Sequence, residues 1–413
     1  MTGIVLAIFA LTYALIVTRR LRWLPIGRSA GALLGAVLMV AAGALTPAES
    51  YAAVDHDTLV LLLGMMLVTA YLDRGGFFRE ATALLVRGCR TPRGLLLGVS
   101  VASGALSALL VNDAVCLFLT PLVVRLCLSC RLPLGPFLLA VATSANLGSA
   151  ATLVGNPQTM LIGSLSGIGF ARYAWLSLPA VLVGWTVNAA LLWALFGRRL
   201  PPEPLALTDP EAARAEGPAP WLSVAVLVGL GAAFLGGLHL GYVALGAALV
   251  FMIADRDEPT AAFAKVDWQL LVFFSGLFVV VAALQRTGLV AQAWEALAPH
   301  MRLDRTAGVL GFTAGMTVGA NTVSNVPLVL LVGPQLGELG GERELAWVLL
   351  GYVTTVAGNL TLIGSVANLI VAERAREHYT LGFWEYLRFG AVSTVACLAL
   401  GVPLLVLWSR AVG

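Results

Sequence analysis

Charged residues are scarce in this sequence. They make up 11% of the 413 residues, against about a quarter in ordinary soluble domains, while 59% of the residues are apolar. A water-soluble enzyme with one buried core would leave much of that apolar surface in water, so lipid is the expected solvent. The five cysteines are too few for a disulfide scaffold, and the 25 basic and 22 acidic residues are too balanced for a nucleic-acid-binding surface. We therefore predict a polytopic membrane protein.

The sequence also lacks the common motifs of catalysis. It contains four histidines but no His-Glu-x-x-His zinc motif, and it has no Walker phosphate-binding loop. We therefore predict that the chain is not an enzyme, needs no cofactor and does not hydrolyse ATP itself. A separate ATPase subunit that drives the chain remains an open alternative.

Apolar runs of about 20 residues, the length that crosses a bilayer as a helix, recur along the chain. We predict membrane segments at 3–18, 27–46, 58–72, 94–127, 135–168, 174–197, 220–237, 239–254, 268–284, 307–334, 346–372 and 387–409. The segments 94–127, 135–168, 307–334 and 346–372 are about 30 residues long, and each has Asn, Gly, Ser, Thr or Pro near its middle. Straight helices of that length would overshoot a hydrocarbon layer of about 30 Å, so these four segments must tilt, break or turn back.

The basic residues favour one topology. If 94–127 and 307–334 are re-entrant hairpins and the other ten segments cross, most Lys and Arg residues fall on one side. The other side receives only Arg172, Arg286, Arg302, Arg305, Arg343 and Arg410. By the positive-inside rule the richer side is cytoplasmic, which places both termini outside a cytoplasmic (inner) membrane.

The polar, proline-rich stretch 198–219 is predicted to be a cytoplasmic linker between two repeats, 1–197 and 220–413. Each repeat has about five transmembrane helices and one re-entrant hairpin, and an odd number of crossings inverts the second copy. The halves also match in sequence: Gly64 and Gly276 are 212 residues apart, Asn112 and Asn325 are 213 apart, and Thr152 and Thr361 are 209 apart. We predict an all-α polytopic fold of two inverted repeats with discontinuous helices at the midplane, a pattern typical of secondary transporters.

The breaks in the four long segments supply the candidate binding residues. In the first half they are Asn112, Asp113, Asn146, Thr152, Gly155, Asn156 and Thr159, and in the second half Ser324, Asn325, Asn359, Thr361, Gly364, Ser365 and Asn368. Amide, hydroxyl and exposed carbonyl oxygens suit a hard cation such as Na⁺, and the start of a half-helix suits an anion. The alternative is that these residues only join packed membrane helices by hydrogen bonds.

Asp113 differs from the other acidic residues because it alone lies deep within an apolar run. An ionisable group at that depth is costly unless it pairs, is hydrated or is protonated, so it is a candidate proton relay or cation ligand. The alternative is an acid that caps the hairpin through a neighbouring Asn or backbone N–H.

The segments around Ala145–Pro157 and Ala357–Gly364, together with Phe273-Phe-Ser-Gly-Leu-Phe, resemble the ion transporter superfamily. This superfamily contains arsenite permeases of the ArsB type, NhaD-type sodium/proton antiporters, citrate transporters and divalent-anion/sodium symporters. The Asn112-Asp113 and Gly155-Asn156-Pro157-Gln158 phrases are most similar to the arsenite-permease and anion-permease branch. The resemblance implies a homodimer with a scaffold domain and a moving transport domain, and Na⁺ near Asn112, Asn156, Asn325 and Asn368.

We therefore predict a secondary transporter that moves a small anion or an arsenite-like solute across the lipid bilayer, with H⁺ or Na⁺ as the coupling ion. A sodium/proton antiporter without an anion substrate is the close alternative. A passive channel is an alternative of another class.

Overall fold

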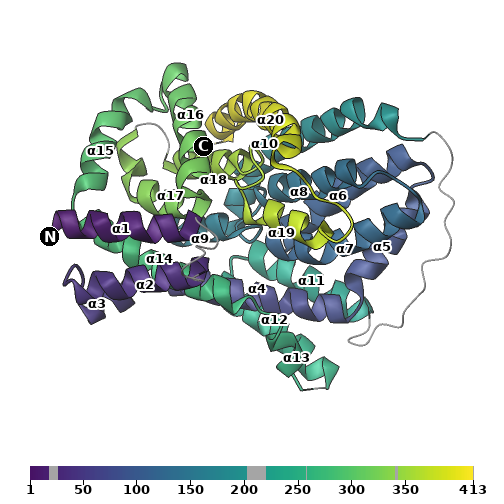
Figure 1. Ribbon diagram of the computed structural model, residues 1–413, viewed down its shortest axis with the longest axis horizontal. Helices are drawn as coiled ribbons and strands as arrows, with labels where there is room; N and C mark the ends of the chain where they lie inside the picture. The colour runs from purple at the N-terminus through teal and green to yellow at the C-terminus, as the bar shows by residue number, and fades with distance from the viewer. Residues whose placement is uncertain (18–26, 202–219, 257, 340–342, 413) are drawn as a thin grey trace.

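The computed structural model describes residues 1–17, 27–201, 220–256, 258–339 and 343–412. Across these residues the chain forms helices and no strand, which confirms the predicted all-α fold (Figure 1). Most of the predicted linker, 202–219, lies outside the described residues, as does 18–26, which includes three basic residues of the charge argument.

The helices fall into two series of ten that follow the same order. The first series is α1 (Thr2–Val17), α2 (Arg28–Ala41), α3 (Pro47–Ala52), α4 (His56–Arg74), α5 (Phe77–Gly88), α6 (Pro92–Leu109), α7 (Asn112–Ser129), α8 (Leu134–Ser149), α9 (Pro157–Ser166) and α10 (Phe170–Leu195), followed by η1 (Gly197–Arg199). The second series is α11 (Pro220–Leu235), α12 (Leu240–Asp255), α13 (Thr260–Phe263), α14 (Trp268–Arg286), α15 (Leu289–Leu297), α16 (Thr306–Val323), α17 (Asn325–Val332), α18 (Arg343–Ala357), α19 (Val366–Ala375) and α20 (Phe383–Val412). Two short 3-10 helices, η2 (Ala298–His300) and η3 (Gly333–Leu339), follow α15 and α17. The short helices α3, α13 and α15 were not predicted.

All four long segments are interrupted, as predicted. The first breaks between α6 and α7 at residues 110–111, and the second between α8 and α9 at 150–156. The third breaks between α16 and α17 at Ser324, and the fourth between α18 and α19 at 358–365. Among the described residues, α4, α6, α7, α10, α14 and α20 are long and apolar enough to cross a bilayer.

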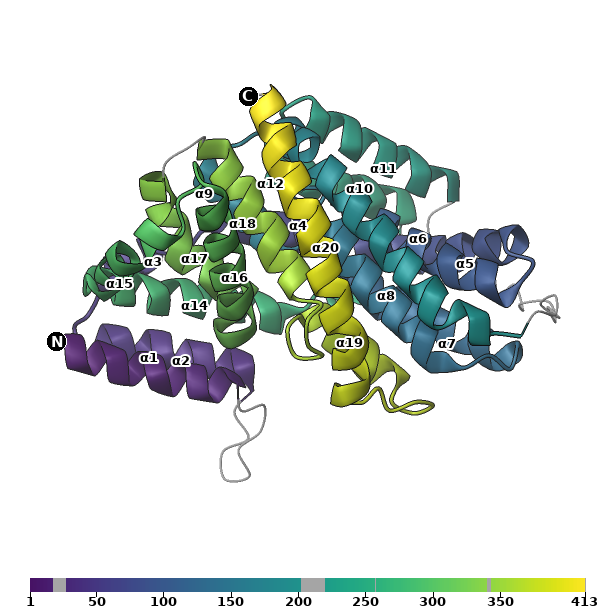
Figure 2. The same ribbon diagram turned by 90° about the horizontal axis from the view of Figure 1, so that it is seen from above.

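The two series do not form separate bundles, because helices of the first series pack against helices of the second. Helix α2 packs against α14, and α4 packs against α12 (Figure 2). A Cβ atom at Gly64 would lie 2.7 Å from the Cβ of Ala244, and one at Gly276 would lie 2.7 Å from the Ala32 backbone. Gly64 and Gly276 are 212 residues apart, as are Ala32 and Ala244, so the two contacts correspond to one another at the offset of the predicted repeat. Such paired contacts are expected of two copies that are related by an internal twofold axis.

Ion pairs show which helix ends lie together. The Lys265 ammonium lies 2.7 Å from the carboxylate of Asp73, so the start of α14 lies beside the end of α4. At the opposite end, the Arg286 guanidinium lies 2.6 Å from the carboxylate of Glu49, which belongs to α3 just before α4. Helices α4 and α14 are therefore antiparallel. We call the Asp73–Lys265 end the first face and the Glu49–Arg286 end the second face.

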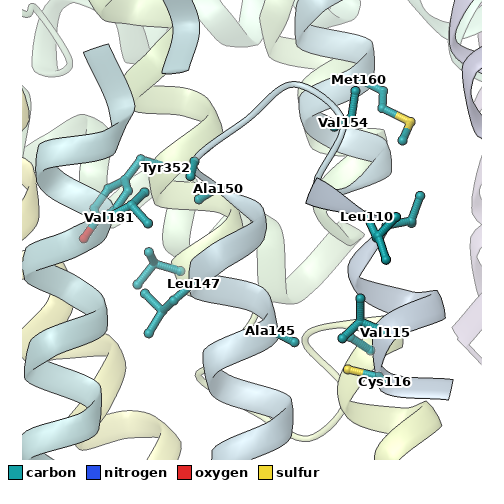
Figure 3. Packing of buried hydrophobic residues seen from close by; sticks show 14 of the residues in the cluster. Leu110, Val115, Cys116, Ala145, Leu147, Ala150, Val154, Met160, Val181 and Tyr352 are labelled. Carbon is teal, nitrogen blue, oxygen red and sulfur yellow. The ribbon is translucent and has the colours of Figure 1, made fainter. Parts of the chain in front are cut away.

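The hydrophobic core surrounds α8, which is buried along its length. Figure 3 shows Val181 of α10 and Tyr352 of α18 on one side of α8, and Val115 and Cys116 of α7 on the other. Close approach depends on small residues, because a Cβ atom at Gly148 would lie 2.0 Å from the Gly104 carbonyl oxygen of α6. This packing fixes where the breaks after α6 and α8 lie along the axes of these two helices.

Candidate functional site

The four breaks meet at one cavity of about 210 Å³. The starts of α7, α9, α17 and α19 all contribute to its wall, and the starts of α2 and α14 complete it. A helix start presents free N–H groups and a partial positive charge, and six helix starts converge on this space. The cavity opens toward the first face, where Asp267 and Gln269 at the start of α14 are exposed.

The start of α9 is set by its own sequence. The Thr159 N–H donates a hydrogen bond to the Asn156 side-chain oxygen at 2.8 Å. In return, the Asn156 N–H donates to the Thr159 hydroxyl oxygen at 3.3 Å. Pro157 occupies the first turn, where its missing N–H costs nothing. The Asn-Pro-Gln-Thr phrase therefore ends the extended break and begins the half-helix at this point.

The tip between α6 and α7 is fastened to the break between α8 and α9. The Asn112 N–H donates to the Gly155 carbonyl oxygen at 2.8 Å. A Cβ atom at Gly155 would lie 2.2 Å from the Ser149 carbonyl oxygen, so a larger residue would force the backbone apart. The Asn112 side-chain oxygen accepts the Asp113 N–H at 2.9 Å, within the first turn of α7.

The equivalent tip between α16 and α17 has a different backbone. Ser324 has φ 74° and ψ 158°, a conformation that favours glycine, whereas its repeat equivalent Val111 has φ −65° and ψ 126°. Asn325, the equivalent of Asn112, is 7% exposed, and its side-chain oxygen has no hydrogen-bond partner within the described part of the chain. Asn325 lines the cavity, but this oxygen is itself buried.

Asn146 joins the two halves behind the cavity. Its side-chain oxygen accepts from the Asn112 amide at 2.9 Å and from the Ser365 hydroxyl at 3.1 Å. Its amide nitrogen donates to the side-chain oxygens of Asn359 and Asn368, at 2.9 Å each. Asn146 is 1% exposed, so its hydrogen-bonding groups are paired with protein rather than with water.

Thr355, the repeat equivalent of Asn146, holds a similar position. Its hydroxyl accepts hydrogen bonds from the Asn156 amide at 3.3 Å and from the Gln158 amide at 3.2 Å. Asn156 also donates to the Ser149 hydroxyl at 2.8 Å. Each half thus offers one buried polar residue to the break of the other half. The hydrogen-bond network couples α8 to α19 and α18 to α9.

Charged side chains at the cavity come from both halves. Among the described lining residues, Asp113 and Asp267 are acidic and Arg28 is basic. With half a positive charge for each of the six helix starts, these groups leave the cavity with roughly two positive charges when both acids are ionised. The site is therefore modestly positive.

The predicted site residues fall into three groups. Those that line the cavity are Asn112, Asp113, Ser324, Asn325, Gly364 and Ser365. Those in the hydrogen-bond network behind it are Asn146, Asn156, Thr159, Asn359 and Asn368. Thr152, Gly155 and Thr361 instead fasten the breaks: the Thr152 hydroxyl donates to the Ala108 carbonyl oxygen and the Thr361 hydroxyl to the Asn321 side chain.

Several lining residues were missed by the sequence analysis. They are Arg28 and Ser29 on α2, Gln158 on α9, and Asp267, Gln269, Phe273 and Phe274 at the start of α14. Gln158 belongs to the Gly155-Asn156-Pro157-Gln158 phrase of the sequence analysis, so the sequence could have indicated it. The residues of α2 and α14 are at ordinary helix starts, and no local signal directs them toward the breaks.

Comparisons with known proteins agree with this architecture. A model of the citrate transporter family matches residues 13–357. The chain is 34% identical to the silicon efflux transporter LSI3 of Oryza sativa subsp. japonica, covering 96% of each chain. It is 30% identical to the putative transporter arsB of Dictyostelium discoideum, covering 93% of this chain and 88% of that one.

Two solved structures share the fold. The YdaH transporter of Alcanivorax borkumensis superimposes with a TM-score of 0.64 at 17% identity, covering 98% of this chain and 96% of that one. The MtrF efflux pump of Neisseria gonorrhoeae superimposes with a TM-score of 0.58 at 14% identity, covering 98% and 94%.

Proposed function

Because the chain belongs to the citrate transporter family, we propose that it is a secondary transporter of a small oxyacid that carries at most one negative charge, such as arsenous or silicic acid. The observation that carries this proposal is the composition of the cavity. Its volume of about 210 Å³ is below the roughly 300–1,000 Å³ of sites for drug-sized ligands. A solute of a few heavy atoms suits such a space.

The charges at the cavity argue against a multiply charged anion such as citrate. One basic side chain, Arg28, lies at the cavity with two acidic ones, Asp113 and Asp267, and the six helix starts add only partial charges. The positive charges of the cavity would not balance all the negative charges of a trivalent anion. Burying an unbalanced charge costs several kcal/mol. A neutral or singly charged oxyacid avoids that cost.

The polar groups suit a solute that carries hydroxyls. Amide side chains both donate and accept, and three residues that carry them, Asn112, Gln158 and Asn325, line the cavity. The N–H groups at the helix starts can donate to a solute oxygen. The names of two relatives point the same way, since one is a silicon efflux transporter and another an arsB transporter.

Binding specificity provides the first test. Thermal unfolding of the purified protein is measured with arsenite, orthosilicic acid, sulfate and citrate, because a ligand that binds the folded state raises its stability by mass action. We expect arsenite or silicic acid to raise the unfolding temperature, and citrate and sulfate to leave it unchanged. A shift with citrate alone would refute the proposal.

We further propose that Asp113 carries the coupling proton. It lies at the start of α7 on the cavity wall, so it can exchange a proton with the aqueous space while the solute is bound. In proteoliposomes, Asp113→Asn should abolish uptake driven by a pH gradient and leave solute counterflow intact. Asp267→Asn is the matched control, because Asn also caps a helix, and it should keep the pH dependence.

A sodium/proton antiporter is the second candidate, because two carboxylates at one cavity also suit a cation. The same proteoliposomes separate the two functions. Sodium flux that responds to a pH gradient in the absence of any oxyacid would favour antiport. Solute counterflow that is independent of sodium would favour the oxyacid transporter.

A further inference from the structure

A second cavity, of about 200 Å³, lies away from the four breaks. Its wall includes Asp57 and Leu61 on α4, Met160 and Ser164 on α9, and His239 and Gly241 at the start of α12. The starts of α4 and α12 lie at the second face, opposite to the starts of α2 and α14 that surround the central cavity. The two cavities therefore open toward opposite faces of the protein.

The internal repeat relates the two cavities to one another. Leu61 and Gly241 of the second cavity are the repeat equivalents of Phe273 and Ser29 of the central one, 212 residues apart. The N-cap residues correspond as well: Asp55 caps α4 and Asp267 caps α14. The same helix ends thus build an opening on each face.

The openings differ in how far they reach. The central cavity reaches Asn112 and Asn325, whereas the second cavity ends at Leu153 and Met160, which are 1% and 2% exposed. Helix α9 separates the two spaces, since Pro157 and Gln158 line the central cavity while Met160 and Ser164 line the second. Movement of α9 would therefore connect the second cavity to the breaks.

One hydrogen bond ties α9 to α4 at this place. The Ser164 hydroxyl donates to a carboxylate oxygen of Asp55 at 2.6 Å, and the other carboxylate oxygen accepts the Thr58 N–H at 2.7 Å. By contrast, the His239–Asp57 contact of 3.3 Å joins α12 to α4 and stays within that helix pair. Among the described residues, the Ser164–Asp55 bond is the side-chain hydrogen bond that joins α9 to α4, at the boundary where α9 would move.

We propose that the second cavity is the access route to the solute site from the second face, closed in this structure, and that the Ser164–Asp55 hydrogen bond is its latch. This inference rests on the proposed transport function. The latch stabilises the state that is open to the first face, and its loss shifts the population toward the state open to the second face. A hydrogen bond to a carboxylate is stronger than one between neutral groups, so a single bond can bias the equilibrium.

Thiol labelling of two repeat-equivalent positions tests the latch. Leu61→Cys reports the second cavity and Phe273→Cys the central one. Each is labelled in detergent with a polar thiol reagent, and the modified peptides are quantified by mass spectrometry. The buried Cys116, Cys127 and Cys397 serve as internal standards for folding. In the latched protein we expect Phe273→Cys to react faster than Leu61→Cys, which replaces a side chain that is 3% exposed.

Ser164→Ala is then combined with each cysteine variant. It should raise the labelling rate of Leu61→Cys about three- to tenfold and lower the labelling rate of Phe273→Cys. Ser164→Thr keeps the hydroxyl and should restore the original rates. Ser275→Ala is the matched control, because the Ser275 hydroxyl bonds only to the Leu271 carbonyl oxygen of its own helix, and it should change neither rate.

An unchanged ratio of the two labelling rates in the Ser164→Ala protein, with the buried cysteines still protected, would overturn the latch. The measurement needs no solute. Failure of the oxyacid proposal would appear in the binding screen and would leave these labelling rates as expected.

Discussion

The hydrogen-bond network at Asn146 leads to the sharpest prediction about stability. Asn146→Ala removes the partner of four groups: the Asn112 amide, the Ser365 hydroxyl and the side-chain oxygens of Asn359 and Asn368. Asn112 and Ser365 line the cavity, so water can replace their lost partner. Asn359 and Asn368 are fully buried and cannot be rescued in this way.

The magnitude follows from those two buried oxygens. Each buried acceptor left without a partner costs about 1–3 kcal/mol, so Asn146→Ala should lower the free energy of unfolding by about 2–6 kcal/mol. Because Asn146 lies in one half and Asn359 and Asn368 in the other, the change should also uncouple the halves. We expect solute counterflow to fall even at temperatures where the variant is folded.

The assay is denaturant unfolding of the purified protein in detergent, followed by counterflow in proteoliposomes. Thr69→Val is the matched control, because within the described part of the chain the buried Thr69 hydroxyl bonds only to the Met65 carbonyl oxygen of its own helix. It should cost less than about 1 kcal/mol, the net value of one hydrogen bond. Were Asn146→Ala as stable and as active as Thr69→Val, the network would not join the halves and the reasoning would be wrong.

Three further predictions concern single positions. Ser324→Gly should raise the free energy of unfolding by about 1 kcal/mol, because it removes a backbone strain of about 1–3 kcal/mol, whereas Val111→Gly should lower it; denaturant unfolding of both variants checks this. Gly155→Ala should cost about 1–3 kcal/mol, because the new Cβ would meet the Ser149 carbonyl oxygen; equal stability of the variant and the native protein would contradict the close approach. The hydrogen bond from Arg286, together with those from Thr46, lowers the pKa of Glu49 from 4.5 to about 2. The ionised Glu49 carboxylate therefore stabilises the folded protein above pH 4.5, and this stabilisation disappears as the pH falls toward 2. Glu49→Gln should therefore lower the unfolding temperature at neutral pH, and the difference from the native protein should shrink as the pH falls below about 4.5; a constant difference would exclude the ion pair as its cause.

Local chemistry explains why the breaks were predictable. Asn156 followed by Pro157 caps a helix and starts the next turn whatever surrounds it, and Gly155 allows the close approach before it. Asn112 begins α7 directly after the extended residue Val111. Residues near a break are thus recognisable from the sequence, and eleven of the fourteen predicted site residues, all except Thr152, Gly155 and Thr361, lie on the cavity or in the network behind it.

Position near a break did not determine the direction of each side chain. Thr152 and Thr361 were predicted to bind solute or ion, yet their hydroxyls donate to Ala108 and Asn321 and fasten the loops. The free backbone groups of an extended segment need partners, and a nearby threonine hydroxyl supplies one. Which threonine does so depends on the neighbouring helix and not on the local sequence.

The sequence by itself determined that this chain is an all-α membrane protein, where its long helices break, and which residue types lie at the breaks. These properties follow from hydrophobic length and from backbone rules that act within a few residues. Only the tertiary structure decided that α2 packs on α14 and α4 on α12, which brings Arg28 and Asp267 to the cavity and places Ser164 on Asp55. Such choices depend on how the surfaces of distant helices fit together, and apolar helices in lipid have many partners of similar composition, so the fit of small residues such as Gly64 and Gly276 selects among them.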